Sequence, residues 1–223
     1  MKHTARTART ARTARTARTA RPAMLLATTT VTCLALADPA AAVGPNLIVN
    51  GTFARPAVLD GPLNYQYVNA FNNSILDGWN VVRGDVDIFS KSLAKAPTRH
   101  QAVNLSGTVP GTISQDFQTT PGYWYTVTWK HSRDTWPACA YTPDQPYEVS
   151  IINVDVRRYQ PQGEPGDWRT PPPITFRATD YTHTLQFAST ISPPSVCGAL
   201  VTDVDVRQSG GSIPEPPEPD STS

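Results

Sequence analysis

Residues 121–129 read Pro-Gly-Tyr-Trp-Tyr-Thr-Val-Thr-Trp, and this stretch decides the fold class. After the Pro-Gly turn, Tyr125, Val127 and Trp129 alternate with other residues, which places all three on one face of an extended chain. Trp124 is out of phase with them and falls on the opposite face. Aromatic and β-branched residues at a period of two, opened by turn residues, predict a half-buried β-strand.

The same alternation recurs in short runs on both sides of this strand. Between residues 147 and 159 the apolar phase switches, which predicts a β-bulge near Ile152. No convincing helix is found, and about nine antiparallel strands in two sheets packed face to face are predicted. The residues expected to face inward are Leu47, Val49, Phe53, Val82, Val86, Ile88, Val103, Leu105, Ile113, Phe117, Leu185, Phe187, Leu200, Val204 and Val206.

Length and composition agree with a single all-β domain. A chain of 223 residues has room for one full domain with extensions at its ends. With 39% hydrophobic and 17% charged residues it is too apolar for a disordered chain, and its 22 prolines argue against a helical one.

The two ends of the chain differ from the middle. Six Thr-Ala-Arg repeats (residues 4–21) precede an apolar segment and the small residues Ala40 to Ala42, the order of a secretory signal peptide. We therefore expect a signal peptide over 1–42, a β-sandwich domain over 43–208 and a disordered, Pro- and Glu-rich tail over 209–223. The expected location is extracellular or associated with a cell wall, with no membrane attachment after cleavage.

The charge balance of the middle region argues against nucleic acid as a partner. Seven of the 19 basic residues lie before Pro22 and one of the 18 acidic residues lies before Val43. The rest of the chain therefore has 12 basic and 17 acidic residues. Phosphate binding needs a surplus of Lys and Arg on one face.

Two cysteines remain once the leader is removed, Cys139 and Cys197. In an oxidising compartment an even count predicts one disulfide, which would stabilise the domain by about 4 kcal/mol. A metal pair is the weaker alternative, because no zinc-ligand spacing joins these cysteines to the scattered histidines. We expect no catalytic or transition-metal cofactor.

The best candidate binding segment is the long connection over residues 130–141. Trp136 and Tyr141 could form a platform for a sugar ring, with Arg133 and Asp134 as hydrogen-bonding neighbours. A disulfide at Cys139 would hold this segment rigid. The alternative is that Trp136 covers the disulfide in a small satellite core.

Other aromatic residues offer weaker candidates. Trp168 lies in a turn-rich loop and could bind ligand or close one end of the sandwich. An early loop with Tyr65 and Tyr67 is the weakest candidate of this kind.

Catalytic motifs are missing from the sequence. There is no nucleophile elbow, no His-Glu-x-x-His and no phosphate-binding glycine loop. The pairs Asp85 with Asp87, and Asp203 with Asp205, each share a strand face, and a solvated face is the expected reading of both.

An ordered set of sequence blocks carries a family resemblance. The blocks lie at residues 46–53, 78–79, 86–87, 101–107, 110–117, 121–129, 197–198 and 203–206. The set resembles the choice-of-anchor C family, which is similar to a plant cell-wall family of unknown function with galactose-binding-like jelly-roll domains. The resemblance implies an exported jelly-roll β-sandwich of a fold that often binds carbohydrate.

The resemblance also raises a structural Ca²⁺, since some related modules bind this ion through acids near the first and last blocks. Here Ala54 follows Phe53 and Thr202 precedes Asp203, so fewer carboxylates are present. We expect a weak Ca²⁺ site or none.

The sequence thus predicts a secreted, monomeric, non-catalytic module that binds cell-wall or extracellular polysaccharide. One alternative is a structural or adhesive extracellular protein that contacts other proteins through a sheet edge. A glycan-active hydrolase is the third reading.

Overall fold

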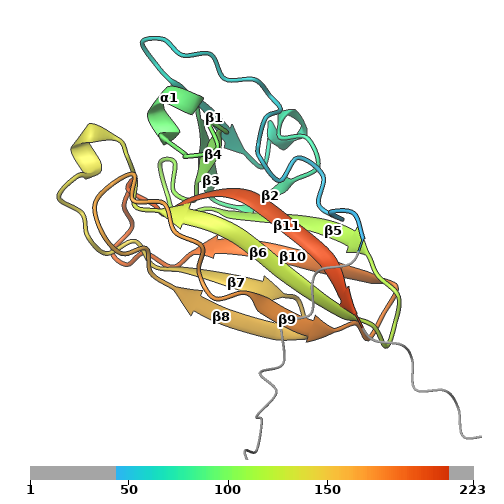
Figure 1. The fold of residues 1–223 in the computed structure, drawn as a ribbon. Helices are drawn as coiled ribbons and strands as arrows, with labels where there is room; N and C mark the ends of the chain where they lie inside the picture. Colours follow the sequence, from blue (N-terminus) through green and yellow to red (C-terminus); the bar gives the residue numbers. More distant parts are fainter. Residues whose placement is uncertain (1–43, 211–223) are drawn as a thin grey trace, which may run out of the picture. The chain divides into compact units, whose positions relative to one another are not determined.

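The computed structural model describes residues 44–210. The expected leader (1–42) and all but the first two residues of the expected tail (209–223) lie outside this range. Within it, two antiparallel sheets pack face to face (Figure 1), which confirms the all-β jelly-roll sandwich. The described residues form eleven strands, two more than expected.

The strands divide unequally between the sheets. In spatial order, the six-stranded sheet contains β1 (Tyr65–Asn69), β3 (Asp85–Phe89), β4 (Ala102–Asn104), β11 (Leu200–Gly210), β6 (Trp124–Ser132) and β9 (Ile174–Arg177). The five-stranded sheet contains β2 (Asn80–Arg83), β5 (Thr112–Gln118), β10 (Thr182–Ser189), β7 (Tyr147–Ile151) and β8 (Asp155–Tyr159). Three short helical segments lie in the connections: η1 (Asn73–Ile75), α1 (Lys91–Ala94) and η2 (Pro137–Cys139).

The core fills the space between the two sheets. Tyr125, Val127 and Trp129 are buried there, as the alternation predicted, and Trp124 on the opposite face is 45% exposed. Trp129 of one sheet meets Phe187 of the other edge to face, with ring centroids 5.6 Å apart. Aromatic contacts of this kind add to the stabilisation from buried area.

A buried polar link also joins the sheets. Trp129 Nε1 donates a 2.8 Å hydrogen bond to the Tyr147 hydroxyl, which lies 2.7 Å from His131 Nδ1. Because an indole nitrogen only donates, the hydroxyl is free to donate to the imidazole. Burial, with the nearby charge of Arg169, lowers the pKa of His131 to about 4, so its ring is neutral at pH 7.

The run from Trp79 to Phe89 is split between the sheets rather than forming one strand. Gly84 joins β2 to β3 with φ +57°, and a Cβ there would clash with the Pro110 carbonyl oxygen. The chain turns at this glycine and the inward phase changes. Val82 is therefore 53% exposed, against the prediction, and Val81 takes the buried position.

Two other local predictions were wrong. The phase switch near Ile152 is a tight turn, residues 152–154, between β7 and β8, and not a bulge. Asn153 occupies the left-handed region there, at φ 63°. The segment with Leu47 and Val49 is irregular, and the first strand among the described residues is β1.

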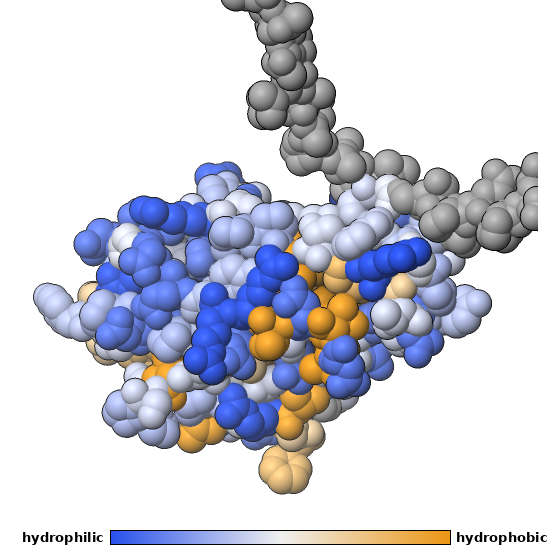
Figure 2. Space-filling model, turned by 90° about the horizontal axis from the view of Figure 1, so that it is seen from below, coloured by the Kyte–Doolittle hydropathy of each residue, from blue (hydrophilic) through white to orange (hydrophobic). Residues whose placement is uncertain are grey.

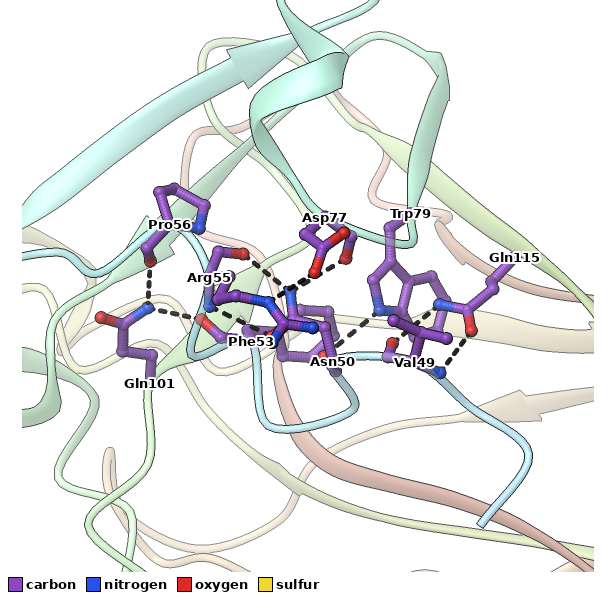
Figure 3. Close-up of polar contacts among 9 residues, drawn as sticks. All are labelled: Val49, Asn50, Phe53, Arg55, Pro56, Asp77, Trp79, Gln101 and Gln115. Carbon is purple, nitrogen blue, oxygen red and sulfur yellow. Dashed lines mark hydrogen bonds and ion pairs between the residues drawn. The ribbon is translucent and has the colours of Figure 1, made fainter.

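Side-chain amides hold this irregular N-terminal segment in place of a strand ladder (Figure 3). Gln115 accepts a hydrogen bond from the Val49 amide and donates one to the Val49 carbonyl. Asn50 Nδ2 donates to the carbonyls of Arg55 and Asp77. These bonds satisfy backbone groups that strand pairing would otherwise satisfy.

The outer faces of the two sheets differ in their aromatic residues. Every aromatic residue in the strands of the five-stranded sheet packs toward the core: Phe117, Tyr147, Tyr159 and Phe187. The surface seen from below is mostly hydrophilic, with hydrophobic residues in a band (Figure 2). The six-stranded sheet, by contrast, has Tyr65 and Tyr67 on the outer face of β1.

Candidate functional site

A cavity of about 360 Å³ lies on the outer face of the six-stranded sheet, where β1, β3 and β4 run side by side. The connection that follows β6 forms one wall and residues 107–108 form another. The cavity is lined by Tyr65, Tyr67, Asp87, Phe89, Asn104, Gly107, Thr108, Asp134, Trp136, Cys139 and Val196.

Strand register brings three polar side chains together on the cavity floor. Asp87 on β3 pairs with Tyr67 on β1 and with Asn104 on β4. Directly paired residues of an antiparallel sheet point to the same face. The inward neighbours Val86 and Ile88 are fully buried in the core, so Asp87 must face outward.

Aromatic rings form the side of the cavity. Tyr65 and Trp136 meet edge to face, with centroids 5.7 Å apart and planes at 84°. Both also pack against a second apolar cluster on this outer face, formed by Phe89, Leu93, Ala94, Ala102 and Leu200. Trp136 therefore contributes to a satellite core and to the cavity wall at once, so the two readings of this residue are compatible.

Asp85 lies two residues before Asp87 on β3, and its carboxylate has a structural role. Its carboxylate accepts hydrogen bonds from the Thr108 amide and hydroxyl, the Val109 amide and the Tyr67 hydroxyl. Burial alone would raise the pKa of Asp85, but these hydrogen bonds outweigh it and hold the pKa below its ordinary value. Asp85 is thus an ionised residue that fixes the 107–108 wall through Thr108 and the adjoining Val109.

Asp87 differs from Asp85 in lacking such partners. Its Oδ1 is buried and has no hydrogen-bond partner among the described residues. Burial, together with the charge of Asp85, raises the pKa of Asp87 to about 7. A buried acceptor without a donor is costly unless a ligand or water supplies one.

Asp134 is the second unusual carboxyl group. It is fully buried, and it accepts hydrogen bonds from the Trp136 amide (2.8 Å) and from Asn104 Nδ2 (3.0 Å). Burial, reinforced by the charge of Asp87, outweighs these bonds and raises the pKa of Asp134 to about 7. The cavity thus holds two carboxyl groups that gain protons near neutral pH.

The wall that carries Trp136 is held by a disulfide and a buried guanidinium. Cys139 and Cys197 are bonded, with Cα atoms 5.4 Å apart, which confirms the expected pair. Arg133, only 8% exposed, donates to the carbonyls of Gly163, Ala140 and Thr142. Its two terminal nitrogens thus tie the Trp136 loop to the connection between β8 and β9, where Gly163 lies.

The cavity includes some of the candidate residues from the sequence and leaves out others. Trp136 and Asp134 line it, whereas Tyr141 is 95% exposed and is not among its lining residues. Trp168 Nε1 donates to the Ala94 carbonyl (3.0 Å) and its ring packs on the outer apolar cluster. A ligand role for Tyr141, Arg133 and Trp168 stays a prediction.

Asp87 and Asn104 are the functional candidates that sequence reasoning missed. Asp87 was assigned to a solvated face, but the connection after β6 covers that face, so the assignment was wrong. That connection lies about 45 residues after Asp87 in the sequence, so local sequence patterns do not reveal the contact. The three-strand register that unites Asp87 with Tyr67 and Asn104 likewise joins segments that are separate in the sequence.

Groups that could hold a metal have other partners in the described residues. Asp134 lies near Cys139 and Cys197, but both sulfurs are in the disulfide. Asp203 pairs with His100 Nδ1 (2.6 Å) and Lys130 Nζ (3.0 Å). Near Ala54, the region where a Ca²⁺ was considered, Gln101 Nε2 donates to the carbonyls of Phe53 and Pro56 (Figure 3).

A family model matches most of this fold. Residues 46–207 match the model described as "Protein of unknown function (DUF642)". The chain belongs to DUF642. The match confirms the resemblance to a family of unknown function, while membership of the choice-of-anchor C group stays a prediction. Among the described residues of this DUF642 protein, no helix has the length and apolar character needed to cross a membrane.

Individual relatives are distant from this DUF642 chain. It is 26% identical over 171 residues to halomucin of Haloquadratum walsbyi, covering 76% of this chain and only 2% of halomucin. It is similar to a family 16 carbohydrate-binding module (TM-score 0.44, 16% identity, 73% of this chain and 100% of the module). It is also similar to TmCBM61, solved with β-1,4-galactotriose (TM-score 0.42, 14% identity, 74% and 99%).

Proposed function

We propose that this DUF642 protein is a secreted, non-catalytic module that binds polysaccharide in the cavity between β1, β3, β4 and the Trp136 loop. One observation carries the proposal: aromatic rings and an unsatisfied carboxylate oxygen, Asp87 Oδ1, line the same cavity. Sugar rings have apolar faces that pack on aromatic side chains, and hydroxyl groups that bond to carboxylates and amides. Asp87 supplies a free acceptor, and Asn104 beside it is hydrogen-bonded to Asp134 and holds the wall of the cavity in place.

The rigidity of the cavity supports binding. The disulfide, Arg133 and the Asn104–Asp134 hydrogen bond fix the wall relative to the sheet floor. A site held in its binding geometry loses less conformational entropy when ligand enters. The single disulfide and the signal-like leader together support an extracellular location.

The non-catalytic part of the proposal is supported by the sequence, which has no nucleophile elbow and no His-Glu-x-x-His motif. Asp87 and Asp134 are carboxyl groups of one cavity whose pKa values are both raised, by burial above all.

Retention on immobilised polysaccharides tests this proposal. We expect retention on at least one polysaccharide of a broad panel, with about tenfold weaker binding for Trp136→Ala because a stacking surface is lost. Trp124→Ala is the matched control, since Trp124 is a partly exposed tryptophan outside the cavity. Trp136→Phe keeps a ring in place and should recover part of the affinity.

Two outcomes would contradict the proposal. Undiminished retention of a folded Trp136→Ala variant would remove the site. No retention on any polysaccharide, accompanied by concentration-dependent self-assembly, would instead favour the adhesive protein considered from the sequence. Turnover of a chromogenic glycoside would restore the hydrolase reading.

A further inference from the structure

We propose that the cavity selects saccharides that carry a protonated amine, such as an amino sugar without its acetyl group. This inference rests on the proposed glycan-binding function and names the ligand class. It follows from three features of the cavity: its charge, its unpaired acceptor and the placement of its aromatic rings.

The charged groups of the cavity are all acidic. Among the described residues, Asp87 and Asp134 line it and no Lys, Arg or His does. Asp85 adds a third carboxylate behind the floor, where its hydrogen bonds are already satisfied. A ligand with a carboxylate or sulfate group would meet like charge in a poorly solvated site, which costs binding energy.

The unpaired acceptor identifies what the ligand must supply. Ionised Asp87 only accepts hydrogen bonds, and its buried Oδ1 has no donor within the described chain. A sugar hydroxyl can donate one bond but leaves the charge uncompensated. An ammonium group donates up to three hydrogen bonds and also neutralises the charge, and such charge-assisted bonds are about twice as strong as neutral ones.

The aromatic rings add a second attraction for a cation. Tyr65, Tyr67 and Trp136 line the same cavity as Asp87. The electron-rich face of an aromatic ring attracts a cation, and the attraction grows when the cation is removed from water. Aromatic rings and an acceptor-only carboxylate together favour an ammonium group over a hydroxyl or an acetamide.

Proton binding by the cavity supports the same conclusion. The groups that face Asp87 are Tyr65 and Tyr67 from β1, Asp85 on its own strand and Asp134 from the loop, while β4 contributes the neutral Asn104. Burial raises the pKa of Asp87 and of Asp134 to about 7. A bound cation would take the place of these protons, so affinity for a permanent cation should rise as pH increases through 7.

Three β-1,4-linked tetrasaccharides of matched length separate the possibilities. At the same position they carry an amine (glucosamine tetramer), an acetamide (N-acetylglucosamine tetramer) or a hydroxyl (cellotetraose). In calorimetric titrations of the purified protein, we expect the amine to bind about tenfold more tightly than either neutral partner. Asp87→Asn should weaken binding of the amine far more than binding of either neutral tetrasaccharide, so that most of the preference is lost. A trimethylated glucosamine tetramer, with its permanent charge, should gain affinity from pH 5 to pH 8.

The controls distinguish failure of this inference from failure of the proposed function. If cellotetraose binds as tightly as the amine and Trp136→Ala abolishes both, the glycan site stands and the amine preference falls. If the preference persists in Asp87→Asn and in Asp134→Asn, it arises elsewhere and the inference is overturned. Binding of a lysine peptide in preference to every saccharide would contradict both proposals. Asp116→Asn, at an exposed strand position on the other sheet, controls for loss of one negative charge.

Discussion

Asn104 Nδ2 lies 3.0 Å from Asp134 Oδ2, so the middle of the β3–β4–β11 sheet is bonded directly to the loop that carries Trp136. The same Asn104 side chain accepts hydrogen bonds from the amides of Ser106 (3.0 Å) and Gly198 (3.1 Å) through Oδ1. The Asn104 side chain therefore joins the cavity floor to the Trp136 loop, to Ser106 just before the 107–108 wall, and to Gly198 beside the disulfide.

We predict that Asn104→Ala destabilises the protein by about 2–4 kcal/mol, because two backbone amides and a buried carboxyl group lose their partner. Chemical denaturation measures the loss. Asn80→Ala, at an exposed position of β2, should change stability by less than about 0.5 kcal/mol. Equal losses of stability in the two variants would show that the hydrogen bonds of Asn104 do not stabilise the fold.

Asp87→Asn should increase thermal stability more at pH 8 than at pH 5. The unfolded carboxyl loses its proton near its ordinary pKa of 3.8, whereas the folded one keeps it until about pH 7. Between these values the folded state binds more protons, so the wild-type protein loses stability as pH rises through this interval. The amide does not titrate and escapes this loss.

The expected difference between the variant and the wild type grows by about 1–3 kcal/mol from pH 5 to pH 8. The variant-minus-wild-type difference removes the opposing effect of His131, whose lowered pKa makes stability fall as pH decreases below about 6.5. A difference that stays constant from pH 5 to pH 8 would show that Asp87 is well solvated.

Tyr147→Phe should cost about 2–4 kcal/mol although it removes a single oxygen atom. The Trp129 indole and the His131 ring would both lose their buried partner. Equilibrium unfolding in denaturant measures the cost. Tyr181→Phe, at an exposed position, is the control and should be neutral. A neutral Tyr147→Phe would mean that the inter-sheet link contributes no stability.

Replacing both cysteines by alanine should lower stability by about 4 kcal/mol on the chain-entropy estimate for the 58-residue separation. It should also weaken polysaccharide retention, because the loop that carries Trp136 loses a covalent constraint. Before this comparison, mass spectrometry of the wild-type protein after treatment with a thiol reagent shows whether the disulfide has formed. Two reactive thiols in the purified protein would show that the bond does not form.

The sandwich was predictable because alternation is a local property. The inward phase of Tyr125, Val127 and Trp129 follows from their spacing alone, and the structure confirms it. Pattern reasoning failed where a glycine changes the phase, as at Gly84, or where a turn breaks a run, as at Asn153. There a backbone conformation, not hydrophobicity, decides which side chain is buried.

The site was predictable only in part. An aromatic residue in a disulfide-held loop pointed to Trp136, which does line a cavity. Asp87 looked like an ordinary surface acid because its burial depends on a loop about 45 residues farther along the chain. Arg133 shows the opposite case, since a residue suited to ligand binding is committed to three backbone carbonyls.

The central claim, that saccharide binds in the cavity at Trp136, is tested most directly by indole N–H signals in NMR. The protein has five tryptophans, so each signal can be assigned by single substitution. Titration with a bound saccharide should shift the Trp136 indole signal most, together with the Asn104 side-chain amide, and leave the Trp124 indole unchanged. A titration that shifts Trp124 and leaves Trp136 and Asn104 in place would contradict the account.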